Sequence, residues 1–175
     1  MGFLFIEGRR LSAWLKRVPP LRWILKVAVR MLAPTHYVGA VVAVFDDSGR
    51  VLIVEHVFRT DHPWGLPGGW ISRGEAPADA VTREVREELQ LDIEVRELIA
   101  AARIPATRMA NHPSHLGLAY YARLRGGRCA PSREVLNVRW ADPDSIDEDL
   151  APFQRHAVVA GRSVFAREQA KTGRK

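Results

Sequence analysis

The chain has 175 residues, 47% of them hydrophobic, which is enough for one domain with a substantial apolar core and excludes wholesale disorder. Its one cysteine, Cys129, excludes an internal disulfide framework and a cysteine-based zinc cluster, and predicts a reducing, cytoplasmic compartment. The formal net charge of +6 is compatible with a nucleic-acid partner, with anionic lipid, or with solubility alone.

The basic charge is concentrated at the two ends of the chain. Residues 1–36 hold seven basic side chains and one acidic one, whereas residues 37–161 hold 14 basic and 18 acidic side chains. The last 14 residues are basic again, with five basic side chains and one acid. We therefore expect three parts, namely an N-terminal extension over 1–36, a main domain over 37–162 and a basic helix end and tail over 163–175.

The N-terminal extension contains a predicted amphipathic helix over residues 21–33. Three basic residues recur every fourth position on one face, and apolar residues line another. The three are Arg22, Lys26 and Arg30. Because these charges interrupt the apolar run, no transmembrane span is expected. A secretory signal is not expected either, because the apolar run is short and no small-residue cleavage site follows it.

Three interpretations of this helix stay open. The one we favour from the sequence is that the apolar stripe packs on the body of the protein or on a second subunit, forming a homodimer. The second is a peripheral membrane anchor on anionic lipid, with Trp14 and Trp23 at the interface. The third is an organelle transit peptide, because the segment is rich in arginine and poor in acids.

The sequence of the main domain predicts strands mixed with helices. An apolar, β-branched run over 37–45 and a second run over 50–56, separated by a turn cluster, predict a hairpin. Residues 57–69 predict a loop, and residues 77–89 predict a helix with Pro77 at its first position. Later strands are expected at 93–102, 116–124 and 135–141, and a last helix at 152–169. Together these elements predict a layered α/β or α+β domain.

The helix over 77–89 carries the residues that are most informative about chemistry. Glu84, Glu87 and Glu88 stand at i, i+3 and i+4, so their carboxylates lie on one side of the helix. Oxygen ligands suit Mg²⁺, Mn²⁺ or Ca²⁺ better than Zn²⁺. Upstream, the glycines of the loop 66–69 allow the backbone to approach an ion or a phosphate closely. The pair of features indicates catalysis on a phosphate ester or anhydride, unless the helix is merely a solvated face with ion pairs.

The wider spacing favours catalysis. From Gly69 onward the sequence has Gly, five residues, Glu75, seven residues, Arg83-Glu84-Val85, one residue, Glu87-Glu88, one residue and Gln90-Leu91. This spacing resembles the Nudix box, which has a glycine where this chain has Gln90. That glycine serves a left-handed helix cap, so Gln90 is expected to cost about 1 kcal/mol there or to change the turn.

The resemblance to the Nudix family implies both a fold and an activity. The fold is an α/β/α sandwich around a mixed sheet, here with an added N-terminal amphipathic helix. The activity is hydrolysis of the pyrophosphate in a nucleoside diphosphate linked to another group, with Mg²⁺ or Mn²⁺. The expected partner is a small nucleotide such as an NDP-sugar, an ADP-ribose-like compound or a (d)NTP.

The resemblance also implies roles for individual residues. It implies that the metal ligands are Glu84, Glu87, Glu88 and the carbonyl of Gly68. Arg83 would orient the carboxylates, and Glu75 would support that arrangement from the loop. Glu134, outside the box, is a further candidate ligand or base, and the choice of general base between Glu84 and Glu134 stays open.

The sequence also suggests residues that contact the substrate and leaves two rival functions open. Three residues outside the box are candidates for substrate contact, and they are Arg59, Trp64 and Arg103. One rival function is pyrophosphate removal from RNA 5′ ends, but the acidic body argues against a nucleic-acid partner. The other rival is a nucleotide-sensing module of the same fold without catalysis, against which the complete set of glutamates argues.

Overall fold

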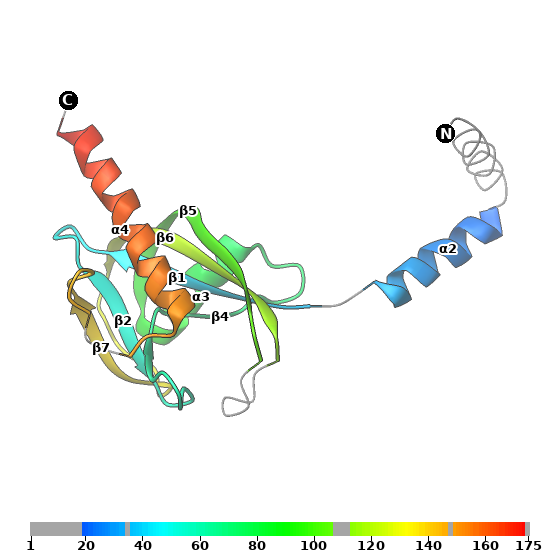
Figure 1. Cartoon of the computed structure of the whole chain (residues 1–175), viewed down its shortest axis with the longest axis horizontal. Helices are drawn as coiled ribbons and strands as arrows, with labels where there is room; N and C mark the ends of the chain where they lie inside the picture. Colours follow the sequence, from blue (N-terminus) through cyan, green and yellow to red (C-terminus); the bar gives the residue numbers. More distant parts are fainter. Residues whose placement is uncertain (1–18, 34–35, 107–112, 147–148, 174–175) are drawn as a thin grey trace. The chain divides into compact units, whose positions relative to one another are not determined.

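The computed structural model describes residues 19–33, 36–106, 113–146 and 149–173. The chain divides into two compact units, Met1–Thr35 and His36–Lys175. The second unit holds most of the chain, and its described residues form a sheet and two helices (Figure 1).

The sheet of the second unit has seven strands of mixed direction. They run in the order β3-β2-β1-β6-β5, with β4 paired with β1 and β7 paired with β2. The pair β1 and β6 is parallel, and the other pairs are antiparallel. The strands are β1 (Tyr37–Phe45), β2 (Val51–His56), β3 (Trp64–Gly65), β4 (Gly68–Trp70), β5 (Leu91–Ile104), β6 (His115–Gly127) and β7 (Val135–Ala141).

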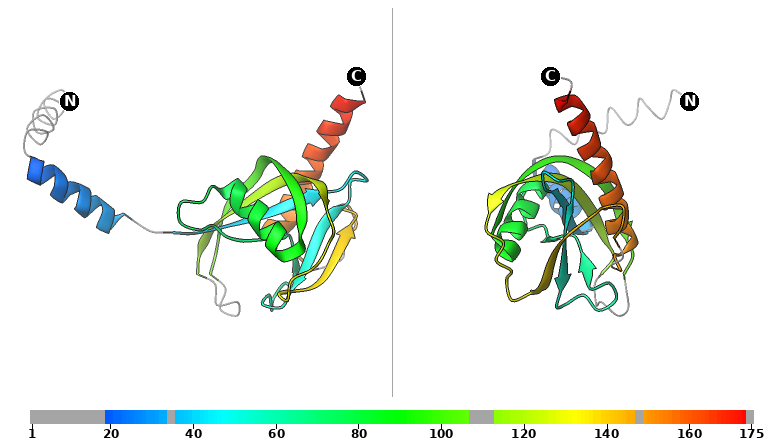
Figure 2. Two further views of the ribbon diagram at one scale, coloured as in Figure 1. Left: turned by 180° about the vertical axis from the view of Figure 1, so that it is seen from behind. Right: turned by 90° about the vertical axis from the view of Figure 1, so that its left-hand side faces the viewer.

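The two helices of this unit, α3 (Pro77–Leu89) and α4 (Pro152–Thr172), cover opposite faces of the sheet (Figure 2). Alternate residues of β1 serve the two layers, as the period of a strand requires. Phe45 lies in the core beneath α4, and Val44 lies in the core beneath α3. The expected α/β/α sandwich around a mixed sheet is therefore confirmed.

The predicted loop over 57–69 differs from expectation because it contains the short strand β3 and the first two residues of β4. Val54 and Glu55 of β2 pair with β3, while residues 39–41 of β1 pair with β4. Glycine and proline disfavour strands locally, but the backbones of β1 and β2 supply hydrogen-bond partners here. This pairing fixes the glycine loop beside the centre of the sheet.

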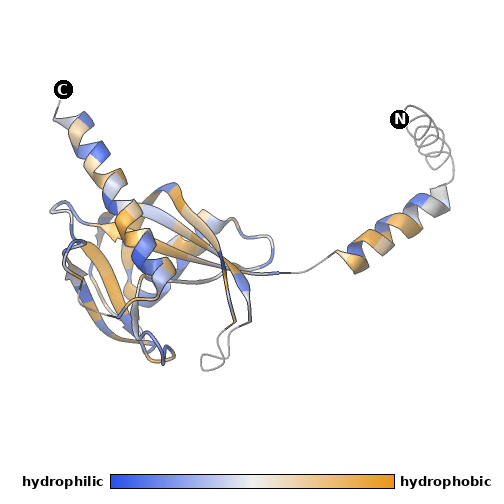
Figure 3. Ribbon diagram, in the orientation of Figure 1, coloured by the Kyte–Doolittle hydropathy of each residue, from blue (hydrophilic) through white to orange (hydrophobic). Residues whose placement is uncertain are grey.

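The described part of the first unit is the helix α2, Pro19–Leu32, which begins with two prolines. Hydrophilic and hydrophobic residues alternate along its ribbon (Figure 3). Its sequence puts the basic residues on one face and apolar residues around the rest. Trp14, which the sequence suggests for an interface, lies outside the described residues. Within the described part of the chain, no helix has the length and apolar character needed to cross a membrane.

Candidate active site

The helix α3 is fixed against the sheet by a stripe of fully buried side chains, Val81, Val85 and Leu89. It ends at Gln90, which adopts the left-handed conformation with φ 57° and ψ 31°. The Gln90 amide donates a hydrogen bond to the carbonyl of Arg86 at 3.0 Å. The left-handed cap is therefore kept without glycine, and the next strand, β5, begins one residue later.

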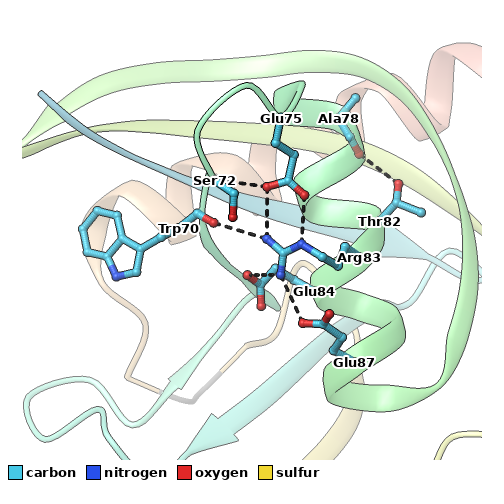
Figure 4. A network of polar contacts seen from close by, with 8 residues as sticks. All are labelled: Trp70, Ser72, Glu75, Ala78, Thr82, Arg83, Glu84 and Glu87. Atoms are coloured by element: carbon cyan, nitrogen blue, oxygen red, sulfur yellow. Dashed lines mark hydrogen bonds and ion pairs between the residues drawn. The ribbon is translucent and has the colours of Figure 1, made fainter.

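Arg83 is the centre of a polar network between α3 and the loop that precedes it (Figure 4). Its Nε donates to Glu75 Oε1 at 2.8 Å and its Nη2 donates to Glu75 Oε2 at 3.2 Å. The backbone amide of Ser72 donates to the same carboxylate at 2.9 Å. Arg83 first, and then the Ser72 amide, lower the pKa of Glu75 to about 2, so Glu75 stays ionised.

The same guanidinium group also bridges two carboxylates on α3. Arg83 Nη1 donates to Glu84 Oε1 at 2.9 Å and to Glu87 Oε2 at 3.1 Å. Glu84 is half-buried, and burial raises its pKa although the charge of Arg83 opposes that shift. Glu87 keeps 60% of its side chain exposed. One cationic nitrogen therefore lies between an inner and an outer carboxylate.

Glu88 is the buried carboxylate of the set, with 6% of the residue exposed. Its Oε1 lies 3.0 Å from His56 Nε2 of β2, which is ion-pair distance without hydrogen-bond alignment. Its Oε2 is buried and has no hydrogen-bond partner among the described residues. A buried carboxylate oxygen without a partner is costly, so this atom is suited to a ligand that supplies positive charge.

The two glycines of the loop permit close approaches to two different elements. Gly68 has φ +145°, and a Cβ there would collide with the carbonyl of Ala40 in β1. A Cβ on Gly69 would lie 2.5 Å from Glu84 Oε1 of α3. Gly68 therefore lets the loop lie against β1, and Gly69 lets it lie against the Glu84 carboxylate.

A cavity of about 520 Å³ opens beside these groups. Six of its lining residues belong to the polar site, and they are Glu84, Glu88, Glu134, Gly68, His56 and Arg59. Glu134 is exposed just before β7, where its carbonyl accepts a hydrogen bond from the Val57 amide at 3.0 Å. Glu87 is absent from the described lining because it lies on the outer side of Arg83.

Arg59 brings a buried positive charge to this cavity. Its Nη2 donates to the carbonyl of Leu66 at 3.1 Å, and Gln154 of α4 accepts a hydrogen bond from the Leu66 amide at 2.6 Å. Arg59 Nη1 is buried without a hydrogen-bond partner in the described part of the chain. Burial lowers the pKa of Arg59, and the charge of Glu88 opposes that shift. This nitrogen is a buried donor whose hydrogen-bonding capacity is unused in the described part of the chain.

Two of the predicted substrate residues lie elsewhere. Trp64, in β3, packs against the core beneath α4, and Arg103 is exposed on β5. Neither is among the described residues that line the cavity. Sequence reasoning missed Gln154 and Trp70, which both line it. Trp70 fills a variable position of the box and Gln154 is 88 residues from its partner Leu66, so neither gave a local signal.

The residues fit a hard divalent cation in their chemistry, although their side chains are not gathered around one point. Within the described residues, no three His, Cys, Asp or Glu side chains lie close enough together to hold a metal ion as they stand. Arg83 Nη1 between Glu84 and Glu87 accounts for part of this separation. The carboxylates that line the cavity, and the unpartnered Oε2 of Glu88, are nevertheless the oxygen donors that Mg²⁺ or Mn²⁺ prefers.

Comparisons with known proteins agree with this geometry. The family model of the NUDIX domain matches residues 35–160. A MutT-like protein of Streptomyces ambofaciens is 31% identical over 119 residues, which cover 67% of this chain and 71% of that protein. The nucleoside diphosphate-linked moiety X motif 6 protein of Xenopus laevis is 36% identical over 121 residues, covering 66% of this chain but only 50% of that relative.

A solved structure shows the same fold. The MutT Nudix hydrolase from Burkholderia pseudomallei superposes with a TM-score of 0.63 at 25% identity, covering 73% of this chain and 98% of that one. The matched residues include all seven strands, the whole of α3 with its glutamates, and the first part of α4. The chain therefore belongs to the Nudix family of hydrolases.

Proposed function

We propose that the chain is a divalent-metal-dependent pyrophosphohydrolase that cleaves the pyrophosphate of a nucleoside diphosphate linked to another group. One observation carries the proposal. Glu88 and Arg59 line a single cavity, and each has a buried polar atom, Glu88 Oε2 an acceptor and Arg59 Nη1 a donor, without a hydrogen-bond partner among the described residues. A pyrophosphate accompanied by a divalent cation would satisfy both groups at once.

The proposed metal ligands are the carboxylates of α3 and one carbonyl of the loop, namely Glu84, Glu87, Glu88 and Gly68. A Mg²⁺ or Mn²⁺ ion bound there would neutralise the charge that develops on the phosphate oxygens during cleavage. Arg83 contributes by holding Glu84 and Glu87, and Glu75 contributes by holding Arg83.

For the general base we favour Glu84 over Glu134. Both line the cavity, as a base that removes a proton from the attacking water must. Arg83 Nη1 holds Glu84 in place by a hydrogen bond of 2.9 Å, whereas Glu134 is exposed on the segment before β7. A fixed carboxylate loses less orientational freedom when it reacts.

Arg59 is the proposed contact to the substrate phosphates, because it lines the cavity and its Nη1 has no hydrogen-bond partner among the described residues. Trp64 and Arg103 lie outside the described lining, so we assign no substrate contact to them. The cavity of about 520 Å³ is in the usual range for a small-molecule site. A small nucleotide is accordingly the proposed partner, and the sole cysteine, Cys129, which is free, supports the proposed cytoplasmic location.

The test is a substrate panel assayed for product with Mg²⁺ and with Mn²⁺. It contains NDP-sugars, ADP-ribose, dinucleoside polyphosphates, (d)NTPs and 5′-triphosphorylated RNA. We expect hydrolysis of a small nucleotide that requires the metal and falls about 1,000-fold in Glu88→Gln. Glu97→Gln, the same change at an exposed residue of β5, is the matched control and should keep full activity.

Each contrary outcome identifies a different function. Full activity of Glu88→Gln would refute the assigned site. Tight nucleotide binding without hydrolysis of any panel member would favour the sensing module. Preferential hydrolysis of the triphosphorylated RNA would favour the RNA 5′-end activity, which the basic residues of 1–36 would support electrostatically.

A further inference from the structure

The helix α2 combines a narrow basic face with a broad apolar face. At 100° per residue, Arg22, Lys26 and Arg30 fall within an arc of about 80°. The helix contains no acidic residue. Six large apolar side chains on the rest of the surface are between 43% and 81% exposed, and they are Trp23, Ile24, Leu25, Val29, Met31 and Leu32.

Trp23 stands at the border between the two faces. Its direction on the helix is about 20° from that of Arg30, at the edge of the basic arc. An amphipathic tryptophan at such a border, beside an acid-free row of cations, is typical of a helix that lies in a membrane interface. There the indole stays at headgroup level while the apolar face enters the acyl region.

We propose that α2 binds the surface of a lipid bilayer rich in anionic headgroups. Charge complementarity carries the choice of partner, because residues 1–36 hold seven basic side chains and one acid. Each basic residue close to an anionic membrane raises the binding constant about fivefold. This takes one of the alternatives that the sequence leaves open, and it does not depend on the proposed hydrolysis, which belongs to the other unit.

A second copy of the chain is a weaker candidate for covering this face. A helix of 14 residues is about 21 Å long, and two such helices packed side by side would bury at most about 800 Å². Stable protein interfaces bury about 1,200 Å² or more. A bilayer has no such requirement for a matching surface, since it accepts the apolar face along the full length of the helix.

The test is co-sedimentation of the full chain with vesicles of phosphatidylcholine alone and with vesicles containing about one third phosphatidylserine. We expect binding to the anionic vesicles that weakens strongly at about 0.5 M salt. The triple variant Arg22→Gln/Lys26→Gln/Arg30→Gln should bind about 100-fold more weakly. The double variant Ile24→Asp/Leu32→Asp, on the apolar face, should also lose binding.

A matched control removes three exposed positive charges from the other unit, in Arg73→Gln/Arg128→Gln/Arg133→Gln. It should bind the anionic vesicles as the unaltered chain does. Absence of binding to either kind of vesicle would overturn the proposal. Binding that survives both α2 variants would overturn it as well, because another surface would then be responsible. If the chain does not bind vesicles but self-associates, and Ile24→Asp/Leu32→Asp abolishes the self-association, then a second copy of the chain covers the apolar face instead.

Discussion

Arg83 holds the Glu75 carboxylate with two nitrogens, Nε at 2.8 Å and Nη2 at 3.2 Å, and this contact ties the loop before α3 to the helix. The third guanidinium nitrogen, Nη1, is thereby directed to Glu84 and Glu87. The position of the two carboxylates on α3 thus depends on a residue that does not line the cavity.

The variant Glu75→Gln tests this dependence. It removes the charge-assisted pair with Arg83, so Arg83 loses its anchor while Glu84 and Glu87 remain. We expect kcat to fall about 10- to 100-fold with little change in KM, as for other residues that orient catalytic side chains without touching the substrate. Steady-state kinetics measure both constants. Asp79→Asn, an exposed acid in the first turn of the same helix, is the control, and equal kcat values in the two variants would contradict the positioning role.

The same pair predicts how stability depends on pH. The ordinary pKa of a glutamate is 4.5, and Arg83 lowers that of folded Glu75 to about 2. Because the folded pKa is the lower one, the pair stabilises the protein above about pH 4.5, and this contribution disappears as the pH falls toward 2. We therefore expect the free energies of unfolding of the unaltered chain and of Glu75→Gln, measured in urea from pH 7 to pH 2, to become equal at low pH. If the difference between these two free energies is the same at every pH, the pKa shift does not come from this pair.

Arg59→Met tests the contact to substrate. Arg59 Nη1 is a buried donor without a partner in the described chain, but Nη2 donates to the Leu66 carbonyl, so the change also removes one hydrogen bond. We expect KM to rise about 10- to 100-fold, with the free energy of unfolding lower by about 1 to 2 kcal/mol. Arg128→Met, at an exposed position, should change neither quantity. An unchanged KM in Arg59→Met would remove Arg59 from the substrate site.

Gly69→Ala tests the close approach of the glycine loop to α3. Its Cβ would lie 2.5 Å from Glu84 Oε1, so the flexible end of Glu84 must move away. We expect kcat to fall at least about 10-fold with a stability loss below about 1 kcal/mol, since only a side chain has to shift. Gly126→Ala has open space around its Cβ and is the matched control, which should keep its activity. A Gly69→Ala variant with normal kcat would show that this position of Glu84 is not required.

The features that sequence predicted well are those set by local spacing. The helix over 77–89 has the observed bounds, because Pro77 starts it and the apolar stripe has the helical period. The outward direction of the Glu87 side chain, away from the cavity, is less evident from the spacing. It is about 100° from Glu88 around the helix, so burying Glu88 turns Glu87 outward toward Arg83.

Other features depend on tertiary contacts and have no local signal. β3 and β4 form only because β2 and β1 offer partners, and local propensity in this glycine-rich stretch argues against strands. The burial of Arg59 depends on the Leu66 carbonyl, and the Leu66 amide is in turn bound by Gln154 at the start of α4. Residues brought together across 88 positions of sequence require the whole sandwich to be known.

Gln90→Gly tests the one departure of this chain from the Nudix box. Gln90 has φ 57°, a conformation that costs a side chain about 1 kcal/mol and costs glycine nothing. Part of this gain is lost because glycine is more flexible in the unfolded chain. We expect a net stabilisation of about 0.5 kcal/mol and a Tm higher by about 1 to 2 °C, with unchanged activity because Gln90 does not line the cavity in the described chain. Gln90→Val should lower the Tm, since a β-branched residue tolerates positive φ least. A Tm that falls in Gln90→Gly would mean that the Gln90 side chain stabilises this turn, and that its left-handed conformation is not strained.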